Sequence, residues 1–126
     1  MKFQMNHLLK LEELGQFILS IVLFNQLNYA WWVFPAIILL PDISMLGYLV
    51  NSKIGAWSYN LFHHKLVGIT LLILGFWLSQ PFSMLVGIVI FGHSAMDRLF
   101  GYGLKYENDF KNTHLGWIGD KKREVD

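Results

Sequence analysis

The composition indicates a chain that lies largely within a lipid bilayer. Of its 126 residues, 54% are apolar and only 15% are charged, and the net charge is +1. A chain this short predicts one domain, residues 1–126, and so few charged side chains could not cover its surface in water. The absence of cysteine excludes disulfides, thiolate metal ligands and cysteine nucleophiles. The small net charge argues against nucleic acid as a partner, because phosphate binding needs a concentrated basic face.

Four apolar runs have the length of about 20 residues that a helix needs to cross a bilayer. They cover residues 8–27, 29–50, 57–78 and 82–100. A secretory signal does not explain the first run, because Glu12 and Glu13 interrupt it and no small-residue cleavage site follows. We therefore expect an all-α fold, a four-helix transmembrane bundle with a short cytoplasmic C-terminal tail over residues 101–126.

The lysines and arginines predict the orientation of this bundle. In a chain with four spans, all ten fall on one side of the membrane: at the amino end, around the second junction, and from Arg98 onward. Cytoplasmic segments carry the excess of positive charge in membrane proteins. The sequence therefore predicts a multi-pass protein of the inner, cytoplasmic membrane with both termini in the cytoplasm.

The last three apolar runs contain aspartate and histidine side chains at similar depths. They are Asp42 in the second run, His63 and His64 in the third, and His93 and Asp97 in the fourth. An ionisable group at such depth costs at least about 2.5 kcal/mol unless it has a partner, and by default it marks a functional site. With a rise of 1.5 Å per residue, all five lie roughly 6–13 Å from the cytoplasmic ends of their helices. We expect them to form one layer in the cytoplasmic half of the bundle.

Two carboxylates and up to three imidazoles at one depth predict a divalent-metal site. The ion that this ligand set favours is zinc, with iron or manganese as alternatives. The residues that we expect to hold it are Asp42, His64, His93 and Asp97. The competing interpretation is that these side chains only make polar contacts between helices, neutralised by Arg98 or Lys65.

The choice between the two adjacent histidines of the third run depends on helix geometry. Neighbouring helical residues point about 100° apart, so His63 and His64 seldom reach one ion together. His64 is slightly favoured because it shares a helix face with Asn60. In the tail, glycines on both sides of Tyr102 permit a sharp turn that would bring His114 back toward the site.

These same residues carry a resemblance to a bacterial integral-membrane family, domain of unknown function 4260. The similar motifs are Pro41-Asp42-Ile43-Ser44, Tyr59-Asn60 followed by His63-His64, His93 with Asp97-Arg98, and the run from Gly101 to Tyr106 that leads to Thr113-His114-Leu115-Gly116. The resemblance covers nearly the whole chain and implies no particular activity.

A looser similarity concerns the chemistry. The order of Pro-Asp, a histidine-bearing helix start and His-x-x-x-Asp is similar to inner-membrane metal-dependent hydrolases related to a LexA-binding protein. That resemblance implies metal-site roles for Asp42, one of His63 or His64, His93 and Asp97. The second acidic residue that follows Pro-Asp in that family is Ser44 here.

Together these patterns predict a metal-dependent hydrolase acting on a membrane-embedded or amphiphilic substrate. His63 or His114 would serve as general base or acid, while Arg98 and Lys105 would hold an anionic headgroup. One alternative is an iron-dependent membrane oxidoreductase with the same ligands, although the Glu-x-x-His signature of such bundles is absent. Another is a small ion or solute transporter that works as a homo-oligomer, with Asp42 and His93 as coupling groups.

Overall fold

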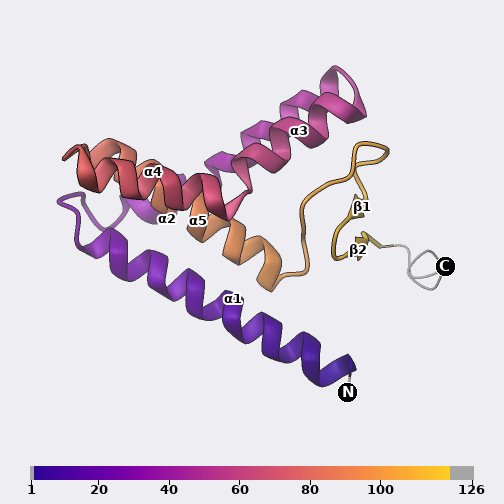
Figure 1. Cartoon of the computed structure of the whole chain (residues 1–126), viewed down its shortest axis with the longest axis horizontal. Helices are drawn as coiled ribbons and strands as arrows, with labels where there is room; N and C mark the ends of the chain where they lie inside the picture. Colours follow the sequence, from indigo (N-terminus) through magenta and orange to yellow (C-terminus); the bar gives the residue numbers. More distant parts are fainter. Residues whose placement is uncertain (1, 120–126) are drawn as a thin grey trace.

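The computed structural model describes residues 2–119, and it is mostly helical (Figure 1). The elements in chain order are α1 (Lys2–Asn25), α2 (Val33–Ile37), the 3-10 helix η1 (Leu40–Leu49), α3 (Ser52–Phe62), α4 (Lys65–Trp77), α5 (Pro81–Leu99), β1 (Asn112–Thr113) and β2 (Gly116–Trp117). The two strands form a small antiparallel hairpin in the tail. The expected all-α class is therefore confirmed.

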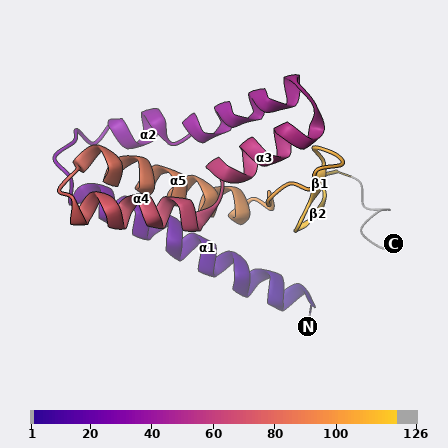
Figure 2. The same ribbon diagram turned by 45° about the horizontal axis from the view of Figure 1, so that its top comes forward.

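Helix α5 is the element around which the other helices pack. It contacts α4 and α1 along its length and also touches η1, and Figure 2 shows it running between these neighbours. Residues 87–95 of α5 are all buried. The hydrophobic core gathers where α1, α2 and α5 meet, and consists of Phe24, Phe34, Leu85, Ile88 and Val89.

Glycines allow the backbones of α4 and α5 to approach each other closely. A Cβ atom on Gly87 would lie 2.5 Å from the carbonyl oxygen of Gly68, and a Cβ on Gly68 would lie 2.8 Å from the carbonyl oxygen of Gly87. Small residues at such contacts are typical of helix pairs in membranes, where close van der Waals packing replaces the hydrophobic effect. Larger side chains at these two positions would push the helices apart.

The second apolar run does not form one continuous α-helix. It is divided into α2 and η1, and Pro41 stands in the first turn of η1. Proline has no backbone N–H and a fixed φ, so it begins a helix more readily than it continues one. This break places Asp42 in the first turn of η1, and η1 packs against α3.

The third apolar run forms two helices, α3 and α4, which we call the third rod. The rod bends by 43° between them, at His63 and His64. The Nδ1 atom of His63 lies 2.8 Å from the carbonyl oxygen of Tyr59. In a continuous α-helix this carbonyl would instead accept a hydrogen bond from the backbone N–H of His63. His64 has extended backbone angles and caps α4, because its Nδ1 accepts a hydrogen bond from the N–H of Leu66 at 3.2 Å. The break therefore gives the two histidines different roles.

Within residues 2–119, one helix is long and apolar enough to cross a membrane by itself. This helix is α5, and α3 with α4 gives a second candidate if the bent pair is counted as one span. The structure thus shows a helical chain with one clear candidate span.

Matched alanine substitutions test the close contact between α4 and α5. In Gly87→Ala the new Cβ meets backbone atoms at 2.5–2.6 Å, so we expect a loss of about 1–3 kcal/mol from overpacking. Gly15→Ala adds a Cβ that meets nothing within 4 Å, and it should gain about 0.5–1 kcal/mol of helix stability. Melting temperatures in one detergent would show these opposite signs. A Gly87→Ala variant as stable as the native chain would contradict the close packing.

Candidate metal centre

Four ionisable side chains from three elements converge at one point of the bundle. Asp42 comes from η1, His63 from the end of α3, and His93 and Asp97 from α5. One ligand atom from each residue lies within 4.8 Å of the others. The two imidazole side chains are almost fully buried, whereas the Asp42 side chain is 36% exposed. By donor type and spacing, this cluster could hold a metal ion.

The hydrogen bonds of the two histidines define which nitrogen faces the cluster. His93 Nδ1 lies 2.6 Å from the carbonyl oxygen of Ile38, and His63 Nδ1 lies 2.8 Å from the carbonyl oxygen of Tyr59. A carbonyl oxygen only accepts, so each Nδ1 carries a proton and donates it. In a neutral imidazole the Nε2 atom then bears a lone pair. In that neutral form both Nε2 atoms can serve as metal ligands.

These two Nε2 atoms face each other at 3.0 Å. Two lone pairs at that distance repel, and a cation between them turns the repulsion into attraction. A tetrahedral ion with metal–nitrogen bonds of about 2.0–2.1 Å would hold its nitrogen ligands roughly 3.3 Å apart. The spacing between the histidines is therefore close to that of a preformed metal site.

The carboxylates complete the cluster. Asp42 Oδ1 lies 3.0 Å from Nε2 of His93 and 3.1 Å from Nε2 of His63. Asp97 Oδ2 lies 3.4 Å from both of these nitrogens. Two negative charges beside two buried imidazoles favour a bound divalent cation, because it would neutralise the carboxylates while satisfying the lone pairs.

Tyr59 supports the cluster from the side of α3, a role that the sequence had not assigned to it. Its carbonyl oxygen accepts the proton of His63 Nδ1, and its hydroxyl donates to Asp97 Oδ2 at 3.2 Å. Its ring also stacks on the His63 ring, with centroids 3.7 Å apart and an interplanar angle of 8°. Outer contacts of this kind fix the orientation of metal ligands. The available sequence signal was the i, i+4 spacing of Tyr59 and His63.

The structure brings together three of the four residues that the sequence predicted as ligands, and it places His63 where His64 was expected. His64 lies outside the cluster as the cap of α4. The physical reason is the break in the third rod, because the argument from shared helix faces assumed a continuous helix. Arg98 lines a small cavity next to Asp97 and Tyr102, and it is not one of the converging residues.

The tail folds back toward α3, whereas His114, which the glycine turn was expected to bring toward the site, is not among the converging residues. We call residues 101–119 the strap. Gly101 has a φ of +92°, which a glycine adopts without strain. The Asn60 side chain fixes the strap, because its Nδ2 donates to the Lys105 carbonyl at 2.7 Å and its Oδ1 accepts from the Lys105 N–H at 2.6 Å.

His114 takes part in the internal structure of the strap. Its Nδ1 accepts a hydrogen bond from the N–H of Leu104 at 2.8 Å, and its own N–H donates to the Leu104 carbonyl at 2.9 Å. Burial, followed by the nearby Arg98 guanidinium, lowers the pKa of His114 below its ordinary value. Its ring is outside the four-residue cluster.

Comparison with known sequences places the chain in one family. The family described as Domain of unknown function (DUF4260) matches residues 6–118, so the chain belongs to this family. All four residues of the cluster and most of the strap fall within the matched range. Comparisons with curated proteins and with solved structures found no match, and the looser similarity to metal-dependent hydrolases is not shown.

Proposed function

We propose that this protein is a multi-pass membrane metalloenzyme whose His/Asp centre catalyses hydrolysis of an amphiphilic substrate. The observation that carries the proposal is the pair of Nε2 atoms 3.0 Å apart, each on a ring whose Nδ1 is hydrogen-bonded to a backbone carbonyl. The ligands would be Asp42, His63, His93 and Asp97. The ligand set contains nitrogen and oxygen only, which favours zinc and also suits iron or manganese.

The exposure of the cluster supports a catalytic rather than a structural ion. Structural zinc sites are usually closed and rich in cysteine, whereas catalytic sites leave a position for water and can expand to five ligands. His93 is fully buried at 0% exposure, but Asp42 is 36% exposed and opens one side of the site. A water molecule would reach the ion from that side.

A bound divalent ion would lower the pKa of its water to about 7 and polarise an ester or phosphoryl group. Asp42 Oδ1 faces the two imidazoles, so its second oxygen, Oδ2, is left to accept the proton of the attacking water. Tyr59 would hold Asp97 and His63 in position during the reaction. The proposed mechanism needs neither His114 nor Arg98.

Exposed apolar side chains support placement of the whole bundle in a membrane. Large hydrophobic residues are exposed along the outer faces of four elements, including Leu11 and Ile18 on α1, Leu46 and Leu49 on η1, Trp57 on α3, and Phe76 and Trp77 on α4. Soluble monomers rarely expose apolar surface on this scale. A bilayer would cover these faces, so we propose four spans formed by α1, α2 with η1, α3 with α4, and α5.

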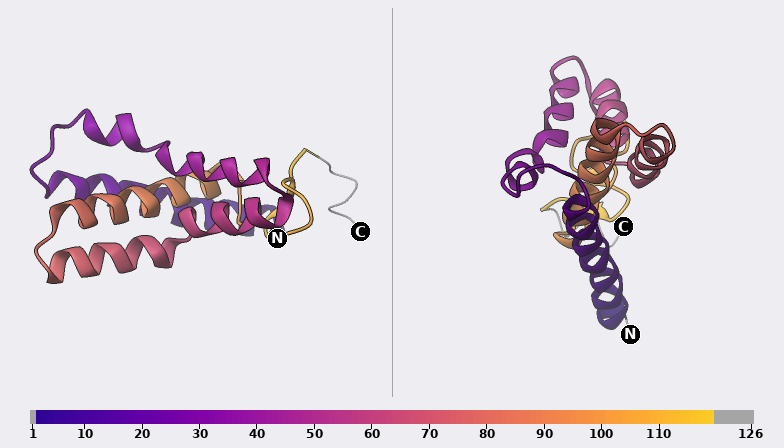
Figure 3. Two further views of the ribbon diagram at one scale, coloured as in Figure 1. Left: turned by 90° about the horizontal axis from the view of Figure 1, so that it is seen from above. Right: turned by 90° about the vertical axis from the view of Figure 1, so that its left-hand side faces the viewer.

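The distribution of charge supports an orientation with both termini in the cytoplasm. The start of α1, the start of α3 and the strap lie toward one end of the molecule, and these parts carry most of the described lysines and arginines (Figure 3). The loops at the opposite end, residues 26–32 and 78–80, carry no charge. Lys121, Lys122 and Arg123 lie outside the described residues. The positive-inside rule then puts the charged end in the cytoplasm.

Single cysteines can test this orientation, because the native chain contains none. Lys53, at the start of α3, and Gln80, in the loop before α5, are both exposed and lie at the two opposite ends of the bundle. We expect a membrane-impermeant maleimide to label Gln80→Cys in intact spheroplasts and Lys53→Cys only after lysis. Labelling of Lys53→Cys from outside, with Gln80→Cys protected, would contradict the orientation.

Metal content of neighbouring alanine variants tests the ligand set. Removal of a ligand should weaken binding more than the roughly 10–100-fold loss typical of an outer contact, so His63→Ala should lose the metal during dialysis. His64→Ala is the matched control and should retain it, because His64 lies outside the cluster. Elemental analysis of protein purified in detergent measures both variants beside the native chain.

Equal metal retention by His63→Ala and His64→Ala would overturn the centre. If the native chain retains near-stoichiometric zinc, hydrolysis of ester and phosphoester lipids should be lost in His63→Ala. Iron with a characteristic absorption spectrum would instead contradict hydrolysis and favour an oxidation reaction at the same ligands.

A further inference from the structure

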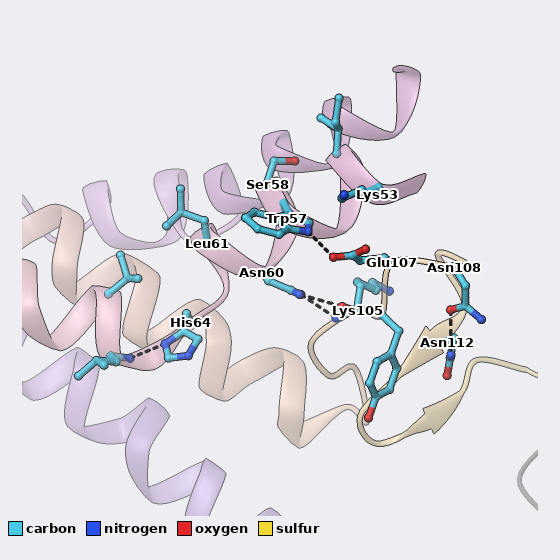
Figure 4. A pocket seen from close by; sticks show the side chains of 14 residues that line it. Lys53, Trp57, Ser58, Asn60, Leu61, His64, Lys105, Glu107, Asn108 and Asn112 are labelled. Carbon is cyan, nitrogen blue, oxygen red and sulfur yellow. Dashed lines mark hydrogen bonds between the residues drawn. The ribbon is translucent and has the colours of Figure 1, made fainter. Parts of the chain in front are cut away.

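A groove of about 1360 Å³ lies beside the metal centre, between α3, the start of α4 and the strap (Figure 4). None of the four proposed metal ligands lines it. Its wall on α3 and α4 includes the apolar side chains of Trp57, Leu61 and Leu66, all of which are more than half exposed. The opposite wall is polar and comes from residues 105–108 and Asn112 of the strap. The groove therefore has one apolar and one polar side.

Lys105, one of the residues that line this groove, is a buried cation that forms no ion pair within the described part of the chain. Only 4% of the residue is exposed. Its ammonium lies 4.8 Å from the centroid of the Tyr59 ring and 3.9 Å from that of Phe110. Within residues 2–119, the ion pairs of 4 Å or less include none with Lys105.

The position of Lys105 is fixed by its backbone rather than by its charge. Asn60 holds both its N–H and its carbonyl, so the side chain starts from a fixed point on the strap. Burial lowers the pKa of the ammonium to about 8, even though the Asp97 and Asp42 charges act in the opposite direction. A buried ammonium that contacts two aromatic rings and has no ion pair within 4 Å in the described residues can gain a great deal from an anion that comes within reach.

The other polar groups of the groove also favour an anion. Lys53 is a second cation in the lining, and the one lining carboxylate, that of Glu107, already accepts a hydrogen bond from Trp57 Nε1 at 2.6 Å. His64 Nδ1 accepts from the Leu66 N–H, so its Nε2 carries the proton and can act as a donor. A phosphate group offers several strong acceptor oxygens and suits such a set of donors.

We propose that this groove binds a phosphate-bearing lipid, with the headgroup on Lys105 and the acyl chain along Trp57, Leu61 and Leu66. The side chains of the apolar wall are themselves more than half exposed, so an acyl chain can reach them from outside the bundle. The Tyr59 ring touches both Lys105 and His63, which places the headgroup one aromatic ring away from the metal centre. That this lipid is the substrate rests on the proposed function, whereas its binding does not.

Quenching of tryptophan fluorescence by a brominated amphiphile tests the groove directly. The probe is 11-bromoundecyl phosphate, added to protein in dodecyl maltoside after treatment with EDTA. We expect saturable quenching that Trp57→Phe removes. Lys105→Gln should weaken binding about tenfold or more through the loss of a charge-assisted hydrogen bond. Lys105→Arg keeps the charge and should restore most of the affinity.

The matched control is Lys111→Gln, which makes the same substitution at an exposed lysine of the strap outside the groove. It should bind like the native chain. The inference is overturned if Lys105→Gln and Lys111→Gln bind equally, or if 11-bromoundecyltrimethylammonium binds as well as the phosphate probe.

Competition experiments identify the ligand class. Competition by inorganic phosphate at the same concentration as dodecyl phosphate would identify a free-anion site and overturn the proposal of a lipid ligand. Stronger competition by dodecanoate would overturn the phosphate headgroup.

The experiment separates this inference from the metal centre because it uses protein without the ion. Saturable phosphate binding in a chain that never retains metal would sustain the groove and overturn the hydrolase. A chain that retains metal through His63 but shows no saturable quenching would sustain the metal centre and overturn the lipid-binding groove. Lys105→Gln should keep its metal and its melting temperature, which distinguishes a binding role from a structural one.

Discussion

The proposed metal centre requires two imidazole rings whose Nδ1 atoms are both hydrogen-bonded to backbone carbonyls. Carbonyl oxygens of Ile38 and Tyr59 accept the Nδ1 protons of His93 and His63, and the two Nε2 atoms face each other at 3.0 Å inside the bundle. Neither ring can turn away without losing a buried hydrogen bond, and such groups are expensive to leave unsatisfied. The bundle thus holds an arrangement that is unfavourable when neutral and unoccupied, and that a divalent cation between the rings would stabilise.

The breaks in the helices are what make this arrangement available. A regular helix uses its own carbonyls, and the carbonyls of Ile38 and Tyr59 are free for histidine only because the second and third rods are interrupted beside them. In membrane proteins, irregular backbone at depth is tolerated where it is buried in protein or lines a cavity. The same interruption at His63 and His64 orients α3 so that Asn60 and Trp57 meet the strap. One structural feature therefore shapes both the centre and the adjacent groove.

Much of this could be predicted from the sequence, because it depends on composition and on positions along a chain. The four apolar runs correspond to four helical rods. The similar depths estimated for Asp42, His93 and Asp97 predicted that they would lie in one layer, and the structure groups them together. The distinction between His63 and His64 could not be predicted, because it depends on a 43° bend between α3 and α4. The argument from shared helix faces assumed one continuous helix. The roles of Tyr59 and Asn60 were also hidden, since the strap that Asn60 binds lies 45 residues further along the chain. Contacts between distant segments leave no periodic signal.

The most direct test of the central claim is X-ray absorption spectroscopy at the zinc edge, on detergent-purified protein loaded with one equivalent of zinc. The account predicts a first shell of nitrogen and oxygen at about 2.0–2.2 Å, together with the multiple scattering of two imidazole rings. A shell of oxygen alone, or scattering from fewer than two imidazoles, would show that the facing Nε2 atoms do not hold the ion. The metal centre would then be contradicted, and with it the proposed hydrolysis.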